Sequence, residues 1–304
     1  MDLCDIHQIR ALLDAHGFHF SKAKGQNFLT RAWVPERIAG EAGVDKECGV
    51  LEVGPGIGCL TQQLCLRAGK VCAVEVDRSL APILEKTLGE FDNLEIIFND
   101  VRKLDLAALV AERFSGLRPM ACANLPYYIT SPILSALLES RAFDSVTVMV
   151  QKEVAQRICA PAGSRDYSAF SVFCQYYSEP APLFDVGPDC FVPRPKVTST
   201  VIQLKTRREP PCELLSEEYF FRTVKAGFGM RRKTACNALA PAFPQLGREG
   251  VADALRACGF EPAVRCETLD IPQFAALSDA LYRASKAQAN GSLGEGAGSA
   301  AGGD

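Results

Sequence analysis

The sequence predicts an α/β domain, with a mainly parallel sheet covered by helices on both faces, followed by a small all-helical domain. Two observations lead to this prediction. From about residue 49 to residue 150, short apolar runs alternate with amphipathic segments, a pattern typical of strands joined by crossover helices. From about residue 214 the strand patterns stop and only helical periodicity remains.

Five apolar runs are the predicted strands of the parallel sheet, at 49–53, 71–76, 94–98, 120–124 and 146–150. Before them, residues 3–16 and 34–42 have the periodicity of helices and would form an N-terminal cap. After them, a helix is predicted at 167–177, and the alternating run at 197–205 is predicted to add a late antiparallel strand.

The C-terminal part has four predicted helices, near 216–227, 234–240, 248–257 and 272–285. The last residues are mostly Ala, Gly and Ser with nothing to bury, which favours a disordered tail. The predicted domains are therefore a sheet domain with its N-terminal cap at 1–212, a helical domain at 213–286 and a tail at 287–304.

Composition excludes several classes of protein. The 304 residues are 48% hydrophobic, with a net charge of −3 and a pI near 5.8, so any nucleic-acid site has to be a local patch. No apolar run reaches the length of a membrane span and no basic, apolar leader opens the chain, which favours a cytoplasmic protein. The 13 cysteines form no C-x-x-C pair and the three histidines lie near the N-terminus, so we expect reduced cysteines and no metal site.

Three of the predicted strands end in residues suited to a nucleotide-like cofactor. Gly54 and Gly56 lie in a glycine-rich turn between the first strand and a helix, where backbone amides can approach a ligand. Glu75, at the end of the second strand, can accept hydrogen bonds from ribose hydroxyls, a geometry that suits NAD and S-adenosylmethionine equally. Asp100 could meet an adenine amino group or simply cap a helix.

The end of the fourth strand, Asn124-Leu-Pro-Tyr127, favours methyl transfer to an exocyclic amine. The Asn124 amide oxygen and a backbone carbonyl next to Pro126 can accept the two N–H groups of the amine and aim its nitrogen at a sulfonium methyl. Pro126 stiffens the turn, and Tyr127 offers a ring on which a base can stack. No strong base is needed, and a base in a duplex would have to be flipped out to reach the site.

Seven motifs in order resemble the small-subunit ribosomal RNA adenine dimethyltransferases, at residues 25–29, 52–61, 73–77, 124–132, 151–154, 191–197 and 228–234. The resemblance covers nearly the whole chain except the tail. It implies a Rossmann-like class I methyltransferase sheet and S-adenosylmethionine as methyl donor. It also implies N6,N6-dimethylation of two adjacent adenosines near the 3′ end of small-subunit (16S) RNA, within an immature small ribosomal subunit.

The resemblance also implies roles for individual residues. Cofactor contacts are expected at six positions: Asn27, Leu29, Gly54, Glu75, Asp100 and Asn124. Phe191 is expected to face Tyr127 across the target adenine. Tyr128 and Met230 depart from the family, since many relatives have Asn and Gln there, which affects the expected substrate details rather than the reaction.

The region from Arg194 to Lys233 has ten basic residues and four acidic ones, which leaves a charge of −9 for the rest of the chain. Such a patch can bind RNA phosphates, although a solvated charged face would have the same composition. The predicted RNA contacts are Arg194, Lys196, Arg231, Arg232 and Lys233.

Other functions remain possible at this point. The nearest is the related large-subunit ribosomal RNA adenine methyltransferase of the macrolide-resistance type; Pro55, the 191–197 motif and the helical C-terminal segment favour the small-subunit enzyme. A non-catalytic ribosome-assembly factor on the same fold would have no need of Glu75, Asp100 and 124–127 together. A dehydrogenase would leave 124–127 unexplained. We expect a monomer.

Overall fold

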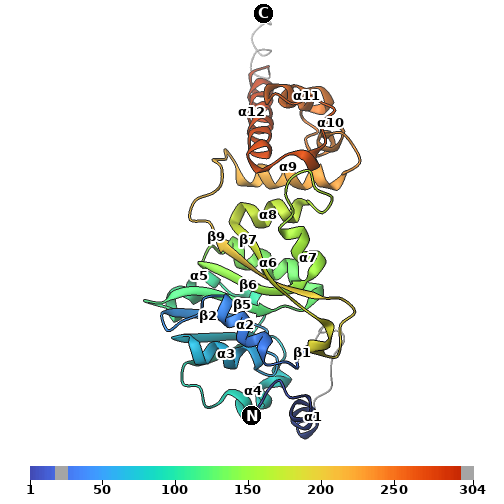
Figure 1. Ribbon diagram of the computed structural model, residues 1–304. Coiled ribbons are helices and arrows are strands. Elements are labelled where there is room, and N and C mark those ends of the chain that lie inside the picture. The colour runs from blue at the N-terminus through green and yellow to red at the C-terminus, as the bar shows by residue number, and fades with distance from the viewer. Residues whose placement is uncertain (18–26, 296–304) are drawn as a thin grey trace, which may run out of the picture. The chain divides into compact units, whose positions relative to one another are not determined.

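The predicted sheet is present in the computed structural model, which describes residues 1–17 and 27–295 (Figure 1). Within these residues the main sheet has seven strands in the order β4-β3-β2-β5-β6-β9-β7. Their bounds are β2 Cys48–Val53, β3 Lys70–Glu75, β4 Leu94–Phe98, β5 Arg118–Asn124, β6 Ser145–Gln151, β7 Ser178–Val186 and β9 Ser199–Thr206. Strands β2 to β6 pair in parallel, whereas β9 is antiparallel to β6 and β7. The six predicted strands are confirmed.

Helices cover both faces of this sheet, with α2, α3 and α4 on one face and α5, α6 and α7 on the other (Figure 1). Their bounds are α2 Trp33–Glu41, α3 Cys59–Arg67, α4 Ala81–Leu88, α5 Leu106–Arg113, α6 Thr130–Glu139 and α7 Lys152–Ile158. Every residue of the central strand β2 is buried. Two covered faces explain why the parallel strands are continuous apolar runs in the sequence.

The N-terminal segment begins with α1, Ile6–Ala15, whose first turn is capped by the Asp5 carboxylate. This oxygen accepts the backbone N–H groups of His7 and Gln8 at 2.8 and 3.0 Å. Further along, β1 (Phe28–Leu29) pairs with β8 (Phe191–Val192) in an antiparallel ladder. The helices α1 and α2 confirm the predicted cap, but a two-residue ladder has no periodicity from which to predict it.

Strand β7 was not predicted, because Pro180 and Pro182 interrupt its pattern. It lies at the edge of the sheet, next to β9, where a residue without a backbone N–H is tolerated. The pairing shifts register between Pro182 and Phe184.

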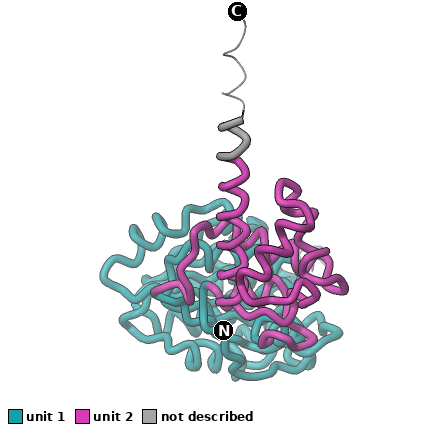
Figure 2. Tube along the Cα trace, turned by 90° about the horizontal axis from the view of Figure 1, so that it is seen from above, with its two compact units in different colours: residues 1–159, 177–208 teal, residues 160–176, 209–304 magenta. Residues whose placement is uncertain are grey.

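The chain divides into two compact units, residues 1–159 with 177–208, and residues 160–176 with 209–295 of the described chain (Figure 2). The predicted helix at 167–177 is confirmed as α8, Ala169–Tyr177. Most of this helix lies in the second unit, because residues 160–176 group with the helical part of the chain rather than with the predicted 1–212 domain. Aromatic packing explains this, because the rings of Tyr176 and Phe220 lie 5.2 Å apart and those of Tyr167 and Phe228 lie 5.5 Å apart.

The second unit confirms the four predicted C-terminal helices as α9 Glu217–Gly229, α10 Ala235–Leu239, α11 Gly247–Ala257 and α12 Ile271–Glu295. The predicted disordered tail from residue 287 is wrong as far as residue 295, because α12 continues through it. Extending an existing helix needs no new nucleation, and the Ala and Gln residues that open this segment favour helix. Residues 296–304 of the predicted tail lie outside the described residues. No helix in the described part is long and apolar enough to cross a membrane.

Candidate active site

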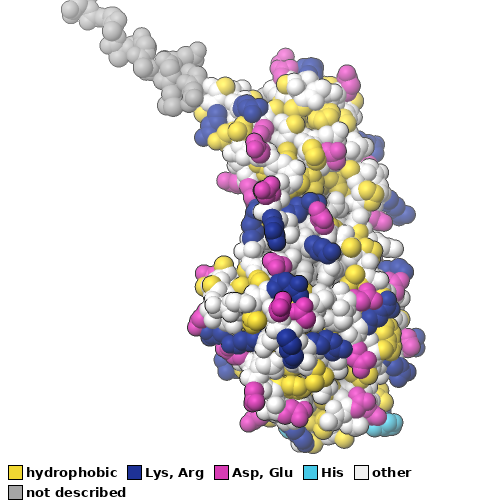
Figure 3. Space-filling view, turned by 60° about the vertical axis from the view of Figure 1, so that its left-hand side comes forward, with side chains coloured by type: hydrophobic (Ala, Val, Ile, Leu, Met, Phe, Trp, Pro, Cys, Tyr) yellow, Lys and Arg dark blue, Asp and Glu magenta, His cyan; other side chains and the backbone are white. Residues whose placement is uncertain are grey.

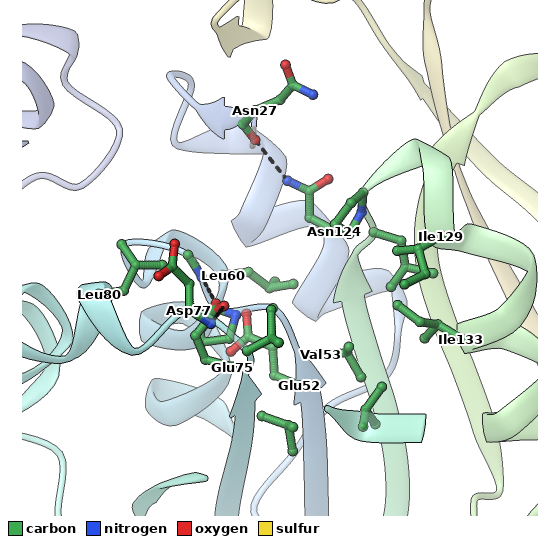
Figure 4. Close-up of a pocket in the computed structure, with 18 of the residues that line it drawn as sticks. Asn27, Glu52, Val53, Leu60, Glu75, Asp77, Leu80, Asn124, Ile129 and Ile133 are labelled. Atoms are coloured by element: carbon green, nitrogen blue, oxygen red, sulfur yellow. Dashed lines mark hydrogen bonds between the residues drawn. The ribbon is translucent and has the colours of Figure 1, made fainter. Parts of the chain in front are cut away.

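A cavity lies at the carboxyl ends of β2, β3, β4 and β5 (Figure 4). Ligands of parallel α/β sheets bind at this edge. All of the predicted cofactor residues are part of its wall: Asn27, Leu29, Gly54, Gly56, Glu75, Asp100 and Asn124. Pro126 and Tyr127 also line it, so the structure brings together residues that five separate stretches of sequence contribute.

The glycine-rich turn after β2 can form only with glycine at its key positions. Gly54 and Gly56 have φ angles of 72° and 61°, in the left-handed region that other residues rarely adopt. A Cβ atom added to Gly56 would lie 3.1 Å from the Phe28 ring, whereas one added to Gly54 would meet nothing within 4 Å. Gly54 therefore leaves open space in the cavity wall, where a ligand can approach the backbone.

Glu75 is held in place by backbone amides from two turns. Its Oε1 accepts the N–H of Asp77 at 2.8 Å, and its Oε2 accepts the N–H of Gly56 at 3.4 Å. Burial raises the pKa of Glu75, and these two hydrogen bonds lower it. The carboxylate is fixed between the glycine-rich turn and the end of β3, with lone pairs left for hydroxyl donors.

Glu52 and Thr61 are buried polar residues for which the sequence analysis gave no role. Glu52 lines the cavity, and both side chains are almost fully buried. Burial raises the pKa of Glu52 to about 8; the nearby Thr61 hydroxyl lowers it and the charge of Glu75 raises it. Glu52 Oε2 and Thr61 Oγ1 have no hydrogen-bond partner in the described structure. A carboxylate inside an otherwise apolar strand was the sequence signal that could have identified Glu52.

Asp100 caps a short helical turn, as one of its two expected roles requires, and its contact with an adenine stays a prediction. Its Oδ1 accepts the N–H of Arg102 at 3.0 Å and caps a short helical turn, Val101–Lys103. The Arg102 guanidinium also binds both carboxylate oxygens, at 3.0 and 2.6 Å. The side-chain hydrogen bond from Arg102 lowers the pKa of Asp100, so this carboxyl is ionised at neutral pH.

Asn124 ends β5 and connects the sheet to the N-terminal segment. Its Nδ2 donates to the backbone carbonyl of Asn27 at 3.4 Å (Figure 4). This contact holds the amide in place by its nitrogen and leaves the Asn124 Oδ1 atom to accept a hydrogen bond from a bound amine.

Tyr127 and Phe191 differ in their relation to the cavity. The Tyr127 hydroxyl bonds to Ser199 Oγ at 2.7 Å, and burial raises its pKa while this bond lowers it. Phe191 is only 5% exposed and pairs with Leu29 in the β1–β8 ladder. Leu29 lines the cavity but Phe191 is not among the described residues that do, so its stacking role stays a prediction.

Comparisons with known proteins agree with this geometry. Residues 17–280 match the sequence model of the family described as ribosomal RNA adenine dimethylase. The chain belongs to the ribosomal RNA adenine dimethylase family. A relative from Shouchella clausii (strain KSM-K16), named ribosomal RNA small subunit methyltransferase A, is 44% identical over 92% of this chain and 96% of its own length. One of that name from Listeria innocua serovar 6a is 44% identical over 89% and 93%.

Solved structures support the dimethylase fold. A dimethyladenosine transferase from Plasmodium falciparum has a TM-score of 0.69 at 24% identity, covering 82% of this chain and 95% of its own. The 23S rRNA methyltransferase ErmE has a TM-score of 0.62 at 27% identity, covering 84% and 99%. The fold is therefore the class I methyltransferase sheet with a helical C-terminal part. The much higher identity to small-subunit enzymes favours these over the large-subunit alternative.

S-adenosylmethionine, the methyl donor of the dimethylase family, fits the residues of the cavity. It carries a positive sulfonium and a positive ammonium group. The wall contains the carboxyl groups of Glu52, Glu75, Asp77 and Asp100, whereas Arg102 is its one basic residue among those described. Glu52 Oε2, buried and without a partner in the described structure, suits a cationic donor, and Gly54 leaves room beside it.

The predicted RNA-binding residues fall into two groups. Arg194 and Lys196 are exposed between β8 and β9, and Arg232 and Lys233 are exposed between α9 and α10. Arg231 instead forms an ion pair with Glu267 and donates to the Ser164 carbonyl at 3.2 Å, within the helical unit. Figure 3 shows Lys and Arg side chains interspersed with Asp and Glu on the face that it presents, which agrees with local rather than overall positive charge.

Proposed function

We propose that this dimethylase transfers methyl groups from S-adenosylmethionine to the N6 atoms of two adjacent adenosines near the 3′ end of small-subunit ribosomal RNA. One observation carries the proposal: Asn124, Pro126 and Tyr127 stand in the wall of the same cavity as the glycine-rich turn, Glu75 and Asp100. The names of the 44% identical relatives support the small-subunit target. The proposed substrate is an immature small ribosomal subunit, in the cytoplasm, and the proposed state is a monomer.

Asn124 is proposed to orient the amine of the target adenine. When bound, S-adenosylmethionine supplies an electrophilic methyl group. The contact with Asn27 directs the Asn124 Oδ1 atom to accept one amine N–H. Pro126 O already accepts the Ile129 N–H and the Thr130 hydroxyl, each at 3.2 Å, so the second acceptor is the carbonyl of Leu125, which precedes Pro126. Two acceptors hold the nitrogen lone pair toward the methyl group, and the proton leaves after transfer.

Tyr127 is proposed to hold the base itself. Its hydroxyl is anchored on Ser199 at the start of β9, which fixes the direction of the ring. Base stacking on an aromatic ring contributes about 1 to 3 kcal/mol. The proposed role of Phe191 on the other side requires its buried side chain to turn toward the cavity when RNA binds.

The test is single-turnover methyl transfer to immature small subunits, followed by digestion and mass measurement of methylated adenosines. Because Asn124 acts on the reacting atom, Asn124→Ala should slow transfer by roughly 10² to 10³, the usual loss for one preorganised polar group. Binding of cofactor and particle should be retained. Asn237→Ala, at an exposed position of α10, is the matched control. Dimethyladenosine formed at the normal rate by Asn124→Ala, or label on cytosine or protein, would refute the proposal.

A further inference from the structure

Cys4 and Cys59 lie side by side although they are distant in the sequence. Each of the two thiols shifts the pKa of the other. The Cys59 Sγ atom also lies 2.8 Å from the carbonyl oxygen of Leu3, which belongs to the peptide group that leads into Cys4. Both thiols are nearly buried in the core cluster that joins α1 to the sheet. The N-terminal turn and the first residue of α3 therefore meet at a pair of thiols.

The surroundings of Cys4 distinguish it from other buried cysteines, whereas the pKa of Cys59 is raised by the Cys4 thiol and by burial. The neighbouring Cys59 thiol lowers the pKa of Cys4, although burial and the carboxylates of Asp2 and Glu36 raise it. Burial instead raises the pKa of Cys65 to about 12 and that of Cys72 to about 11. Because the thiolate is the reactive form, Cys4 is better suited to react with an oxidant than these two.

The pair also touches the cofactor site. Cys59 directly follows Gly58 of the glycine-rich turn, and it is part of the cavity wall. Its Sγ lies 3.9 Å from the carbonyl oxygen of Leu29, another residue of that wall. A covalent change at Cys59 therefore acts on the turn that receives the cofactor.

We propose that Cys4 and Cys59 are a modification site, in which a hydroperoxide converts the two thiols to a disulfide and links the N-terminal segment to the cofactor turn. The Cys4 thiolate attacks a peroxide oxygen, the O–O bond breaks, and a sulfenic acid forms while the released hydroxide takes up a proton. The Cys59 sulfur then attacks the Cys4 sulfur, the S–S bond forms and water leaves with the Cys59 proton. Two thiols lose two electrons, and hydrogen peroxide is reduced to two water molecules.

Cofactor binding and this oxidation oppose each other. A ligand in the cavity covers the wall that contains Cys59 and restrains the glycine-rich turn that precedes it. The ligand-free protein should therefore be oxidised faster than the ligand-bound protein. This inference goes beyond the proposed methyl transfer, since neither the bond nor its detection requires turnover.

The experiment treats the full chain with hydrogen peroxide, blocks the remaining thiols with iodoacetamide and digests with trypsin without reduction. We expect a disulfide-linked pair of peptides, residues 1–10 and 47–67, and an intact mass reduced by two hydrogen atoms. The second peptide also contains Cys48 and Cys65, so fragmentation must place the bond at Cys59. Cys4→Ser should abolish the linked pair, whereas Cys65→Ser, on the same helix as Cys59, should leave it intact.

A second arm repeats the oxidation with S-adenosylhomocysteine at a concentration shown by calorimetry to saturate the protein. The linked pair should then form several-fold more slowly. Linkage of Cys4 to Cys48 or Cys65, or a sulfinic acid at Cys4 without any bridge, would overturn the assignment of the pair. An unchanged rate in the saturated protein would overturn its coupling to the cofactor site. Neither result depends on methyl transfer, so the proposed function is tested separately.

Discussion

The two ends of the active-site cavity are built in different ways. At the cofactor end, Glu75 is held by amides of Gly56 and Asp77, in turns that directly follow two paired strands. At the acceptor end, Asn124 depends on Asn27 and Tyr127 depends on Ser199, which come from distant parts of the chain. The anchoring of Glu75 follows from the sheet alone, whereas the anchoring of Asn124 and Tyr127 requires the N-terminal segment and β9 to be in place. Disturbing β9 should therefore impair methyl transfer before it impairs cofactor binding.

The largest effect is expected for Glu52 at the cofactor end. Its pKa is about 8 in the folded protein, against an ordinary value of 4.5, so the folded state binds the proton more tightly than the unfolded state. Stability is therefore lost as pH rises from about 4.5 to about 8, by up to about 5 kcal/mol. Glu52→Gln removes this loss and should flatten the free energy of unfolding between pH 5 and pH 9, measured with denaturant on the ligand-free protein.

The control for this prediction is Glu85→Gln, at an exposed position on α4. It should keep the pH dependence of the parent protein. If Glu52→Gln also kept the pH dependence of the free energy of unfolding, the buried Glu52 carboxyl would not be its source, and the raised pKa of Glu52 would be refuted.

Glu75→Ala tests whether the cofactor end binds its ligand independently of the acceptor end. Losing hydrogen bonds to a charged acceptor should weaken S-adenosylmethionine binding by about 1 to 3 kcal/mol, measured by calorimetry. RNA binding in the absence of cofactor should not change. Glu90→Ala, exposed just beyond α4, serves as the control. Equal cofactor affinity in the Glu75 and Glu90 variants would remove the ribose role from Glu75.

Two substitutions of Tyr127 separate stacking from anchoring at the acceptor end. Tyr127→Ala should weaken RNA binding by about 1 to 3 kcal/mol because the base can no longer stack, and it should also slow transfer. Tyr127→Phe keeps the ring and loses only the bond to Ser199, so its cost should be about 1 kcal/mol. Particle-binding titrations and single-turnover rates measure both. A Phe variant as impaired as the Ala variant would mean that the hydroxyl, not the ring, carries the function.

The smallest effect is expected for the basic residues that follow α9. Arg232→Ala with Lys233→Ala should reduce the slope of log affinity against log salt by about one for each RNA phosphate that the protein no longer neutralises. Arg231→Ala should instead lower the stability of the helical unit by about 1 kcal/mol, because Arg231 is paired with Glu267. Salt titrations and thermal unfolding distinguish these outcomes. If only Arg231→Ala changed the salt slope, Arg231 would be the RNA contact, and Arg232 and Lys233 would not be.

The sequence was sufficient to predict features that depend on local pattern. The parallel strands are apolar runs because both faces of the sheet are covered, and the residues at their ends then meet at one edge. Residues 160–176 group with the helical unit through the packing of distant rings, such as Tyr176 against Phe220, which the sequence pattern does not reveal. The pairing of Arg231 with Glu267 and the burial of Phe191 likewise depend on distant parts of the chain, which periodicity does not reveal.

The prolines of β7 have a consequence for the behaviour of the protein in concentrated solution. An exposed sheet edge offers unpaired N–H and C=O groups to a strand of another molecule, which is a common route to aggregation. Pro180 and Pro182 lie two residues apart on this edge strand, and neither has a backbone N–H that could bond to an added strand. The irregular register that follows Pro182 further disrupts a straight template. Pro180 and Pro182, which interrupt the strand pattern in the sequence, thus protect the edge of the sheet against the addition of a strand from another molecule.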